Sequence, residues 1–441
     1  MARMAYLVGV VVVVLVVLLS IALHEIGHMV PAKRFGVRVS QYMVGFGPTL
    51  WSRRRGETEY GLKAIPLGGY VRLIGMYPPG EAVGDPPARG WLGRVASDAR
   101  AASAEEIRPG EDHRAFYRLS TPKKLVVMLG GPVMNLVIAF VLMGVGAVAL
   151  GTPSSSTTLG TVSQCVLPVD AAADATCSAD DAPAPGAAAG LQPGDTVRTF
   201  DGTRIDSWDQ LTTLIRASGG ESVPVTVERA GADVDLTVTP VVAQRPVLDA
   251  DGNVVENADG TIQTVPVGYL GVSPTTVMER ASILSVPGEV AERTGQTASV
   301  VGTLPSKVMS LVRSTVDDTP RDSSSIIGVV GIGRFAGEIT SADGPGMDWQ
   351  LRVAALLDML ASLNLALFVF NLIPLPPLDG GHVVAALWEG ARRQVARLRG
   401  LPRPGPFDTA KLVPLAYAVF VLLGGVGLLL VYADLVNPVQ I

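Results

Sequence analysis

The sequence of 441 residues is poor in charged residues, histidine and cysteine. Charged residues make up only 17% of it and hydrophobic residues 48%, which indicates a membrane protein. The net charge of −5 is spread along the chain, and the lack of a basic stripe argues against a nucleic-acid partner. The 2 cysteines, Cys165 and Cys177, either form a disulfide outside the cytoplasm or remain two free thiols.

Four long apolar stretches predict four transmembrane helices. They cover about residues 5–30, 125–150, 353–373 and 412–432. The first stretch lacks a small-x-small cleavage site before His24, so it is expected to remain as a span and not to act as a signal peptide. The second and fourth stretches contain no histidine or acidic residue, which argues against a metal transporter. The three later spans exclude a secreted soluble protease.

Basic residues are concentrated in two of the segments that connect the predicted spans. Residues 31–124 include a run of three arginines, and residues 382–411 contain five arginines. By the positive-inside rule both segments are cytoplasmic. Both termini and the long segment between the second and third spans are then extracytoplasmic, in a multi-pass protein of the plasma membrane.

The first span ends in the motif His24-Glu25-Ile26-Gly27-His28. On a helix, residues four apart face the same way, so His24 and His28 are placed to hold one zinc ion. Glu25 lies beside them as a candidate general base. The alternative is a chance match with ordinary core histidines. Ionisable groups at membrane depth are costly and usually functional, and two of the 4 histidines lie in this motif, so the zinc site is favoured.

The third span is followed by a proline-rich stretch that contains Asn371, Asp379 and His382. Irregular backbone at membrane depth is tolerated only where it is buried or lines a cavity. Asp379 and His382 are both candidate third zinc ligands, since a carboxylate and an imidazole suit zinc equally well. Asn371 is placed to hydrogen-bond a substrate strand. Asn135, in the second span, either orients the site or the substrate backbone or ties two helices together.

Two further regions connect the spans. Residues 37–76 predict short strands beside the zinc motif, and such a sheet offers an edge for an extended substrate strand. Residues 78–109 are rich in Ala, Gly, Pro and charge and predict a flexible insert. The order of turns, strands and one helix over residues 157–242 resembles a bacterial PDZ domain with a cysteine-containing insert. Residues 275–313 alternate as an amphipathic helix on the outer membrane surface.

In order and topology, these features resemble the site-2 protease family, the intramembrane zinc metalloproteases of peptidase family M50. The resemblance rests on the His24-to-His28 motif, Gly131-Pro132-Val133-Met134-Asn135, the PDZ-like domain and residues 371–381. Four spans with one PDZ-like insertion look like the bacterial branch that cleaves anti-sigma factors. The resemblance implies one Zn²⁺ ion bound by His24, His28 and Asp379, catalytic Glu25, substrate contact by Asn371 and a membrane-associated β-sheet.

The predicted function is a zinc-dependent intramembrane endopeptidase that cuts within the transmembrane segment of single-span membrane proteins. Glu25 is the expected general base and zinc-bound water the nucleophile. The expected substrates are anti-sigma factors already trimmed outside by another protease, with the PDZ-like domain as a size filter in regulated intramembrane proteolysis. The alternative is a membrane receptor or scaffold that uses the PDZ-like domain and has a structural zinc.

The predicted fold is a polytopic α-helical membrane protein with four transmembrane helices, a small membrane-associated β-sheet and an inserted extracytoplasmic PDZ-like α+β domain. Its expected boundaries are the first span with the zinc motif at 1–30, the cytoplasmic sheet and flexible insert at 31–124, the second span at 125–150, the PDZ-like domain at 157–242, a linker with an amphipathic helix at 243–350, the third span with the Asp motif at 351–381, a basic cytoplasmic loop at 382–411 and the fourth span at 412–433.

Overall fold

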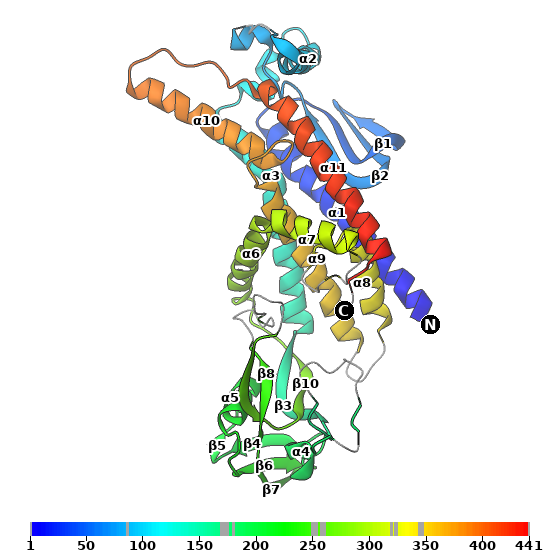
Figure 1. Cartoon of the computed structure of the whole chain (residues 1–441). Helices are drawn as coiled ribbons and strands as arrows, with labels where there is room; N and C mark the ends of the chain where they lie inside the picture. Colours follow the sequence, from blue (N-terminus) through cyan, green and yellow to red (C-terminus); the bar gives the residue numbers. More distant parts are fainter. Residues whose placement is uncertain are drawn as a thin grey trace. The chain divides into compact units, whose positions relative to one another are not determined.

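A computed structural model of the chain describes residues 2–84, 88–167, 176–178, 181–247, 255, 262–317, 321, 325–342 and 348–439. The chain folds into two compact units, whose elements are labelled in Figure 1. One unit combines Met1–Leu150 with Ala281–Ile441, and the other is Gly151–Arg280. The segment between the second and third spans therefore contributes a separate unit and also helices of the first unit.

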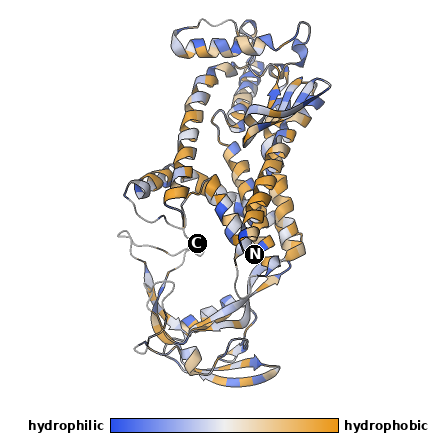
Figure 2. Ribbon diagram, turned by 90° about the vertical axis from the view of Figure 1, so that its right-hand side faces the viewer, coloured by the Kyte–Doolittle hydropathy of each residue, from blue (hydrophilic) through white to orange (hydrophobic). Residues whose placement is uncertain are grey.

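The described part of the first unit contains 4 helices that are long and apolar enough to cross a membrane. They are α1 (Ala2–Arg34), α3 (Thr121–Val145) with a π-helical turn (Gly146–Leu150), α9 (Trp349–Asn371) and α11 (Val413–Val436). Figure 2 shows hydrophobic residues, in orange, along these helices. The prediction of four membrane-length helices is therefore confirmed.

Helices α1 and α3 meet with backbone against backbone at a pair of glycines. A Cβ atom on Gly27 would lie 2.2 Å from the Gly130 carbonyl oxygen, and one on Gly130 would lie 1.9 Å from that of Gly27. No larger residue fits at either position, because small residues are what allow helix backbones to approach so closely. This crossing fixes the end of α1 that carries the histidine motif.

The strands of the first unit form one antiparallel hairpin, β1 (Val39–Arg55) and β2 (Thr58–Leu73). The sequence predicted short strands over residues 37–76, whereas the hairpin has two long strands with several register shifts. Gly45 and Gly68 have φ angles of 93° and 140°, so they allow bulges that bend the strands without ending them. These glycines therefore bend two long strands and do not divide them into the short strands that the sequence predicted.

Two stretches that were predicted as irregular are helical. Helix α2 (Gly90–Glu105) lies within the insert of residues 78–109, of which residues 85–87 fall outside the described part. Helix α10 (Asp379–Leu398) occupies most of the loop expected at residues 382–411, and the third span ends at Asn371. Both helices are rich in alanine, which favours helix, and each buries one side. The residues on these buried sides include Ala96, Arg100 and Ser103 of α2 and Ala385, Ala386 and Glu389 of α10.

The amphipathic stretch expected at residues 275–313 forms two helices after a strand. Helices α6 (Val286–Gly302) and α7 (Leu304–Val316) are followed by α8 (Val329–Ser341). Short 3-10 turns lie at Gly80–Val83, Asp112–Arg114, Phe116–Arg118 and Thr409–Leu412.

The first turn of α8 is capped by a carboxylate from another helix. Asp434 of α11 accepts hydrogen bonds from the backbone N–H groups of Gly328 at 2.9 Å and Gly331 at 2.8 Å. Its other oxygen pairs with Arg321 Nη1 at 3.0 Å, and both side chains are buried. A carboxylate at a helix N-terminus satisfies amides that have no partner within the helix and interacts favourably with the helix dipole. Asp434 therefore joins α11 to α8, and α8 in turn packs on α1.

The second unit consists of one sheet with strand order β10-β3-β4-β6-β7, in which β5 pairs with β4, and a separate β8-β9 hairpin. Its core includes Leu159, Phe200 and Leu211. The strands are β3 (Thr152–Val162), β4 (Thr196–Phe200), β5 (Thr203–Arg204), β6 (Val223–Arg229), β7 (Ala232–Val238), β8 (Val241–Pro246), β9 (Thr264–Tyr269) and β10 (Val272–Glu279), and the helices are α4 (Pro185–Ala188) and α5 (Trp208–Ala217).

The second unit is longer than the domain predicted at residues 157–242. Part of the expected linker belongs to it, because β9 pairs with β8 and β10 returns to pair with β3. Such pairings join strands that are far apart in the sequence and leave no local signal. A disulfide joins Cys165 and Cys177, so the two cysteines are not free thiols. Residues 168–175 between them lie outside the described part of the chain.

Candidate metal centre

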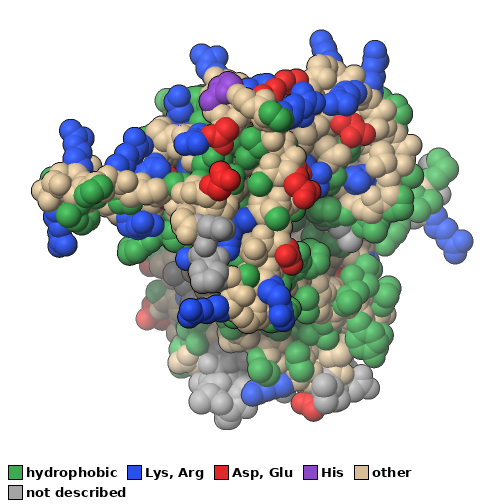
Figure 3. Space-filling model, turned by 90° about the horizontal axis from the view of Figure 1, so that it is seen from above, with side chains coloured by type: hydrophobic (Ala, Val, Ile, Leu, Met, Phe, Trp, Pro, Cys, Tyr) green, Lys and Arg blue, Asp and Glu red, His purple; other side chains and the backbone are tan. Residues whose placement is uncertain are grey.

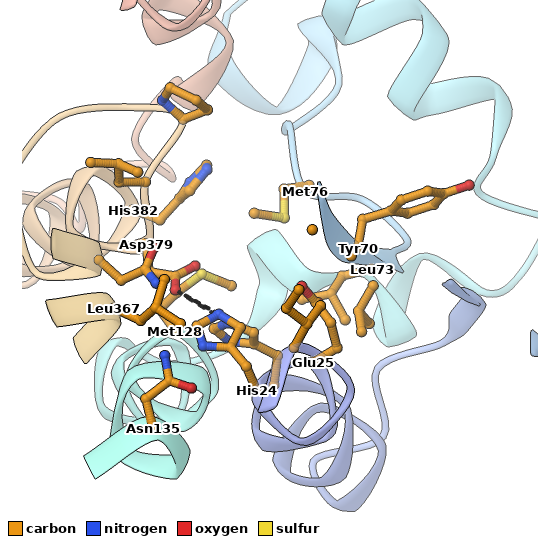
Figure 4. A pocket seen from close by; sticks show the side chains of 18 of the residues that line it. His24, Glu25, Tyr70, Leu73, Met76, Met128, Asn135, Leu367, Asp379 and His382 are labelled. Atoms are coloured by element: carbon orange, nitrogen blue, oxygen red, sulfur yellow. Dashed lines mark hydrogen bonds and ion pairs between the residues drawn. The ribbon is translucent and has the colours of Figure 1, made fainter. Parts of the chain in front are cut away.

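Three side chains from two helices converge near the end of α1. His24 and His28 lie one helical turn apart on α1, and Asp379 is the first residue of α10. The two Nε2 atoms are 3.2 Å apart, and Asp379 Oδ2 lies 3.4 Å from that of His24 and 3.3 Å from that of His28. In Figure 4 the side chains of His24 and Asp379 point toward each other. Among the described residues, these three are the group of His, Cys, Asp and Glu with the spacing of metal ligands.

The hydrogen bond of His28 to the backbone shows which ring nitrogen is free to bind a metal ion. Its Nδ1 donates to the Val127 carbonyl oxygen of α3 at 2.8 Å, because a carbonyl oxygen can only accept. In the neutral ring, Nε2 then carries a lone pair in place of a hydrogen. This lone pair faces the carboxylate of Asp379 at 3.3 Å. Converging acceptors repel each other unless a cation lies among them, and the Nδ1 bond is typical of a histidine oriented toward a metal.

The donor set and its spacing fit a zinc ion. Zinc–nitrogen and zinc–oxygen bonds of about 2.0–2.1 Å in tetrahedral geometry place neighbouring donor atoms about 3.3 Å apart. The three separations of 3.2, 3.3 and 3.4 Å agree with that spacing. Two imidazoles and one carboxylate are also a ligand set of catalytic zinc sites, which keep a fourth position open.

Glycines hold these side chains in place. The backbone of α3 passes so close to the imidazoles that a Cβ atom on Gly131 would lie 2.2 Å from His28 Nε2 and 2.7 Å from His24 Nε2. At the start of α10, a Cβ atom on Gly380 would lie 2.2 Å from the Ile373 carbonyl oxygen. The chain between α9 and α10 therefore folds back closely over the start of α10. The contact between Gly131 and the imidazoles was not predicted from the sequence.

Glu25 lies beside the three donors and against strand β2. Its side chain is buried and lines the same cavity as the donors. A Cβ atom on Gly69 would lie 3.0 Å from Glu25 Cγ, so the backbone of β2 packs directly on this side chain. Tyr42 Oη of β1 donates to the Ala22 carbonyl oxygen at 2.8 Å, three residues before Glu25. The hairpin therefore helps to position Glu25.

A cavity of about 570 Å³ opens at this centre. Asn135 is only 1% exposed, and its Oδ1 has no hydrogen-bond partner within the described part of the chain. Asn371 is the last residue of α9. The structure brings together around this cavity the six residues singled out from the sequence: His24, Glu25, His28, Asn135, Asn371 and Asp379.

The cavity wall contains further residues, of which the sequence indicated only His382. His382, the alternative third ligand, lines the cavity but does not belong to the group of three donors. Phe46, Tyr70, Leu367 and Phe420 line it as well, and they come from β1, β2, α9 and α11. Apolar residues of this kind carry no local signal, because only the tertiary fold brings the four elements to one place.

The chain is similar to known metalloproteases over both of its units. Residues 12–401 match the model of Peptidase family M50. The zinc metalloprotease Rip1 of Mycobacterium tuberculosis is 35% identical over 439 residues, which cover 99% of this chain and 100% of that protein. Rip1 of Mycolicibacterium smegmatis is 34% identical over 453 residues, with coverage of 99% and 100%. The metalloprotease MmpA of Caulobacter vibrioides is 28% identical over 389 residues, with coverage of 86% and 85%.

Proposed function

The chain belongs to peptidase family M50 and is a zinc metalloprotease, and on this basis we propose that it cuts within the membrane-spanning segments of its substrates. The observation that carries the proposal is the position of Glu25 and the three donors on one cavity. That cavity is lined by residues from α1, α3, α9 and α11, the helices long and apolar enough to cross a membrane. A receptor or scaffold with a structural zinc is not favoured, because the relatives are named metalloproteases.

In this proposal His24, His28 and Asp379 hold the zinc ion. Bound there, zinc would act as a Lewis acid on the peptide carbonyl and would lower the pKa of water toward neutrality. Glu25 takes a proton from the attacking water and passes it to the leaving amine, as a general base and then a general acid. The backbone of β2 keeps the Glu25 carboxylate directed at the cavity.

The remaining polar groups of the cavity serve the substrate backbone. A helical substrate has its carbonyl groups in internal hydrogen bonds, so the segment to be cut must first unwind. Asn135 and Asn371 then bond to the unwound strand, and the Asn135 Oδ1 atom is suited to this because no described residue bonds to it. The edge of the hairpin near residues 68–71 lies along the same cavity and supports an extended strand.

We further propose that the substrates are single-span membrane proteins, among them anti-sigma factors, and that the enzyme lies in the inner membrane with its centre toward the cytoplasm. The basic residues of residues 31–124 and of α10 support this orientation. Figure 3 looks onto the end of the molecule that carries these segments and shows many Lys and Arg side chains there.

The proposal is tested by incubating the purified protein in detergent with a single-span reporter substrate and mapping the cut by mass spectrometry. We expect a cut inside the membrane-spanning segment, loss of cleavage on chelation and recovery on adding one equivalent of Zn²⁺. Asp379→Asn should weaken zinc retention, whereas His382→Gln should retain the metal. A cut confined to the soluble parts of the substrate, or cleavage that survives full chelation, would contradict the proposal.

The second unit is proposed to act as an extracytoplasmic PDZ-like size filter that admits only trimmed substrates. The chain offers a clean way to remove it, because the Ala281 backbone N–H donates to the Ala147 carbonyl oxygen at 3.0 Å. The residues of the first unit that flank the second unit on each side are therefore close together. Gly151–Arg280 can be replaced by a short linker. We expect the shortened protein to cut untrimmed and trimmed reporters at similar rates and to keep its zinc. Unchanged selectivity for trimmed substrate would remove the filter role.

A further inference from the structure

A second cavity lies between α2 and α11, apart from the one that contains Glu25. It has a volume of about 930 Å³. Helix α2 belongs to the insert of residues 78–109, which has no part in the proposed chemistry. The cavity, called here the α2–α11 groove, is lined by residues that include Trp91, Leu92, Ala96 and Arg100 of α2, Lys411, and Pro414, Leu415, Tyr417, Ala418 and Val421 of α11.

The walls of the groove are apolar and open to the surroundings. Trp91 and Leu92 are 62% and 59% exposed, and Tyr417 and Val421 are 60% and 72% exposed. Side chains of this size are rarely left together in water. Because α11 is one of the membrane-length helices, its exposed side faces lipid acyl chains. Trp and Tyr are enriched at the level of lipid headgroups, so Trp91 and Tyr417 indicate that the groove opens at the membrane interface.

One end of the groove is positively charged. Arg100 Nη1 lies 3.5 Å and Lys411 Nζ 3.9 Å from the same carboxylate oxygen, Asp408 Oδ2. Two cations share one carboxylate, so Arg100, Lys411 and Asp408 together carry one positive charge. The Lys411 side chain is 63% exposed, and Arg94 lies exposed on α2 three residues after Trp91. The groove therefore combines a long apolar wall with a cationic mouth.

We propose that the α2–α11 groove binds one anionic phospholipid of the surrounding membrane. The headgroup phosphate lies against the exposed Lys411, while the buried Arg100 offsets the charge of Asp408 beside it, and an acyl chain follows the apolar side chains of Tyr417 and Val421. Phospholipids are the partners whose chemistry matches both parts, because one molecule carries a phosphate directly beside a long apolar chain. Phe420 of the same helix lines the cavity that contains Glu25, so α11 borders both the groove and that cavity.

Trp91 provides the test, because a brominated acyl chain quenches tryptophan fluorescence only on contact. The full-length protein is placed in phosphatidylcholine bilayers that contain equal mole fractions of either brominated phosphatidylglycerol or brominated phosphatidylcholine. The difference between the wild-type protein and Trp91→Phe isolates the signal of Trp91 from those of the other tryptophans. We expect the anionic brominated lipid to quench Trp91 more strongly. Lys411→Gln should weaken this preference about fivefold, the effect of one basic side chain at a membrane surface.

Arg397→Gln is the matched control, since it removes one exposed positive charge on α10 and leaves the groove unchanged. It should keep the wild-type preference. Equal quenching by the two lipids, or a preference that Lys411→Gln does not change, would overturn the anionic site. Absence of quenching by either lipid would also overturn the proposal, because no acyl chain would then reach Trp91. None of these readings depends on proteolysis or on zinc, so the test stands apart from that of the proposed function.

Discussion

Replacing Glu25 by glutamine should lower the rate of substrate cleavage by about 10²–10⁴-fold while the zinc remains bound. Glutamine has nearly the same shape as glutamate, so the contact with Gly69 and the packing against β2 are kept. The amide cannot take a proton from water or return it to the leaving amine. The three proposed zinc ligands, His24, His28 and Asp379, are untouched by the change. This variant should therefore lose cleavage activity and keep its zinc.

The measurement is the single-turnover cleavage rate of a reporter substrate together with the zinc content of the same sample. Glu81→Gln serves as the control, because it removes an exposed carboxylate from the 3-10 turn Gly80–Val83, away from the cavity. Its cleavage rate should equal that of the wild type. If Glu25→Gln cut at the wild-type rate, the general-base role would be wrong. If it lost its zinc, the loss of activity would no longer identify a proton-transfer step.

Replacing Gly131 by alanine should remove zinc binding and, with it, all activity. The added methyl group would lie 2.2 Å from His28 Nε2 and 2.7 Å from His24 Nε2, far inside van der Waals contact. The helix cannot move aside, because the neighbouring Gly130 is in backbone contact with Gly27 of α1. The imidazoles must therefore turn away from Asp379. In an ordinary helix position, the same substitution stabilises by roughly 1 kcal/mol.

Gly144→Ala is the matched control, since Gly144 lies on the same helix and its nearest neighbour, Ile283 Cδ1, would be 3.6 Å from the new methyl group. That variant should keep both zinc and activity. Zinc content by mass spectrometry and thermal unfolding in detergent distinguish loss of the centre from loss of the fold. Gly131→Ala protein that is folded and carries one equivalent of zinc would contradict the arrangement of α1 and α3 described above.

The parts of the site that were predictable from the sequence are those set by local geometry. His24 and His28 are four apart in an apolar helix, and that spacing alone places both rings on one side. Asp379 and His382 could not be separated by ligand chemistry. In the structure, Asp379 is the first residue of α10 and lies within 3.4 Å of both histidine Nε2 atoms, whereas His382 does not belong to this group. Gly380 allows the chain before α10 to pack closely on its first turn.

The parts that were misjudged depend on contacts between distant segments. Helices α2 and α10 contain alanine and arginine in stretches that also hold glycine, so composition alone indicated an insert and a loop. The buried sides of these helices depend on partners from other segments. Asp408 pairs with Arg100 of α2, and Lys124 Nζ lies 2.9 Å from Glu389 of α10. The extent of the second unit depends in the same way on the pairing of β10 with β3.

The cap on α8 implies an order of assembly during synthesis. Gly328 and its capping residue Asp434 are 106 positions apart, so the first turn of α8 is made well before the carboxylate that satisfies its amides. Until α11 is in place, Arg321 also lacks its buried partner. The cap on α8, a helix that packs on α1, can therefore be completed only after α11 has been synthesised. Helix α1, which carries His24, is synthesised first, yet its neighbour α8 is capped by a residue of the last membrane-length helix.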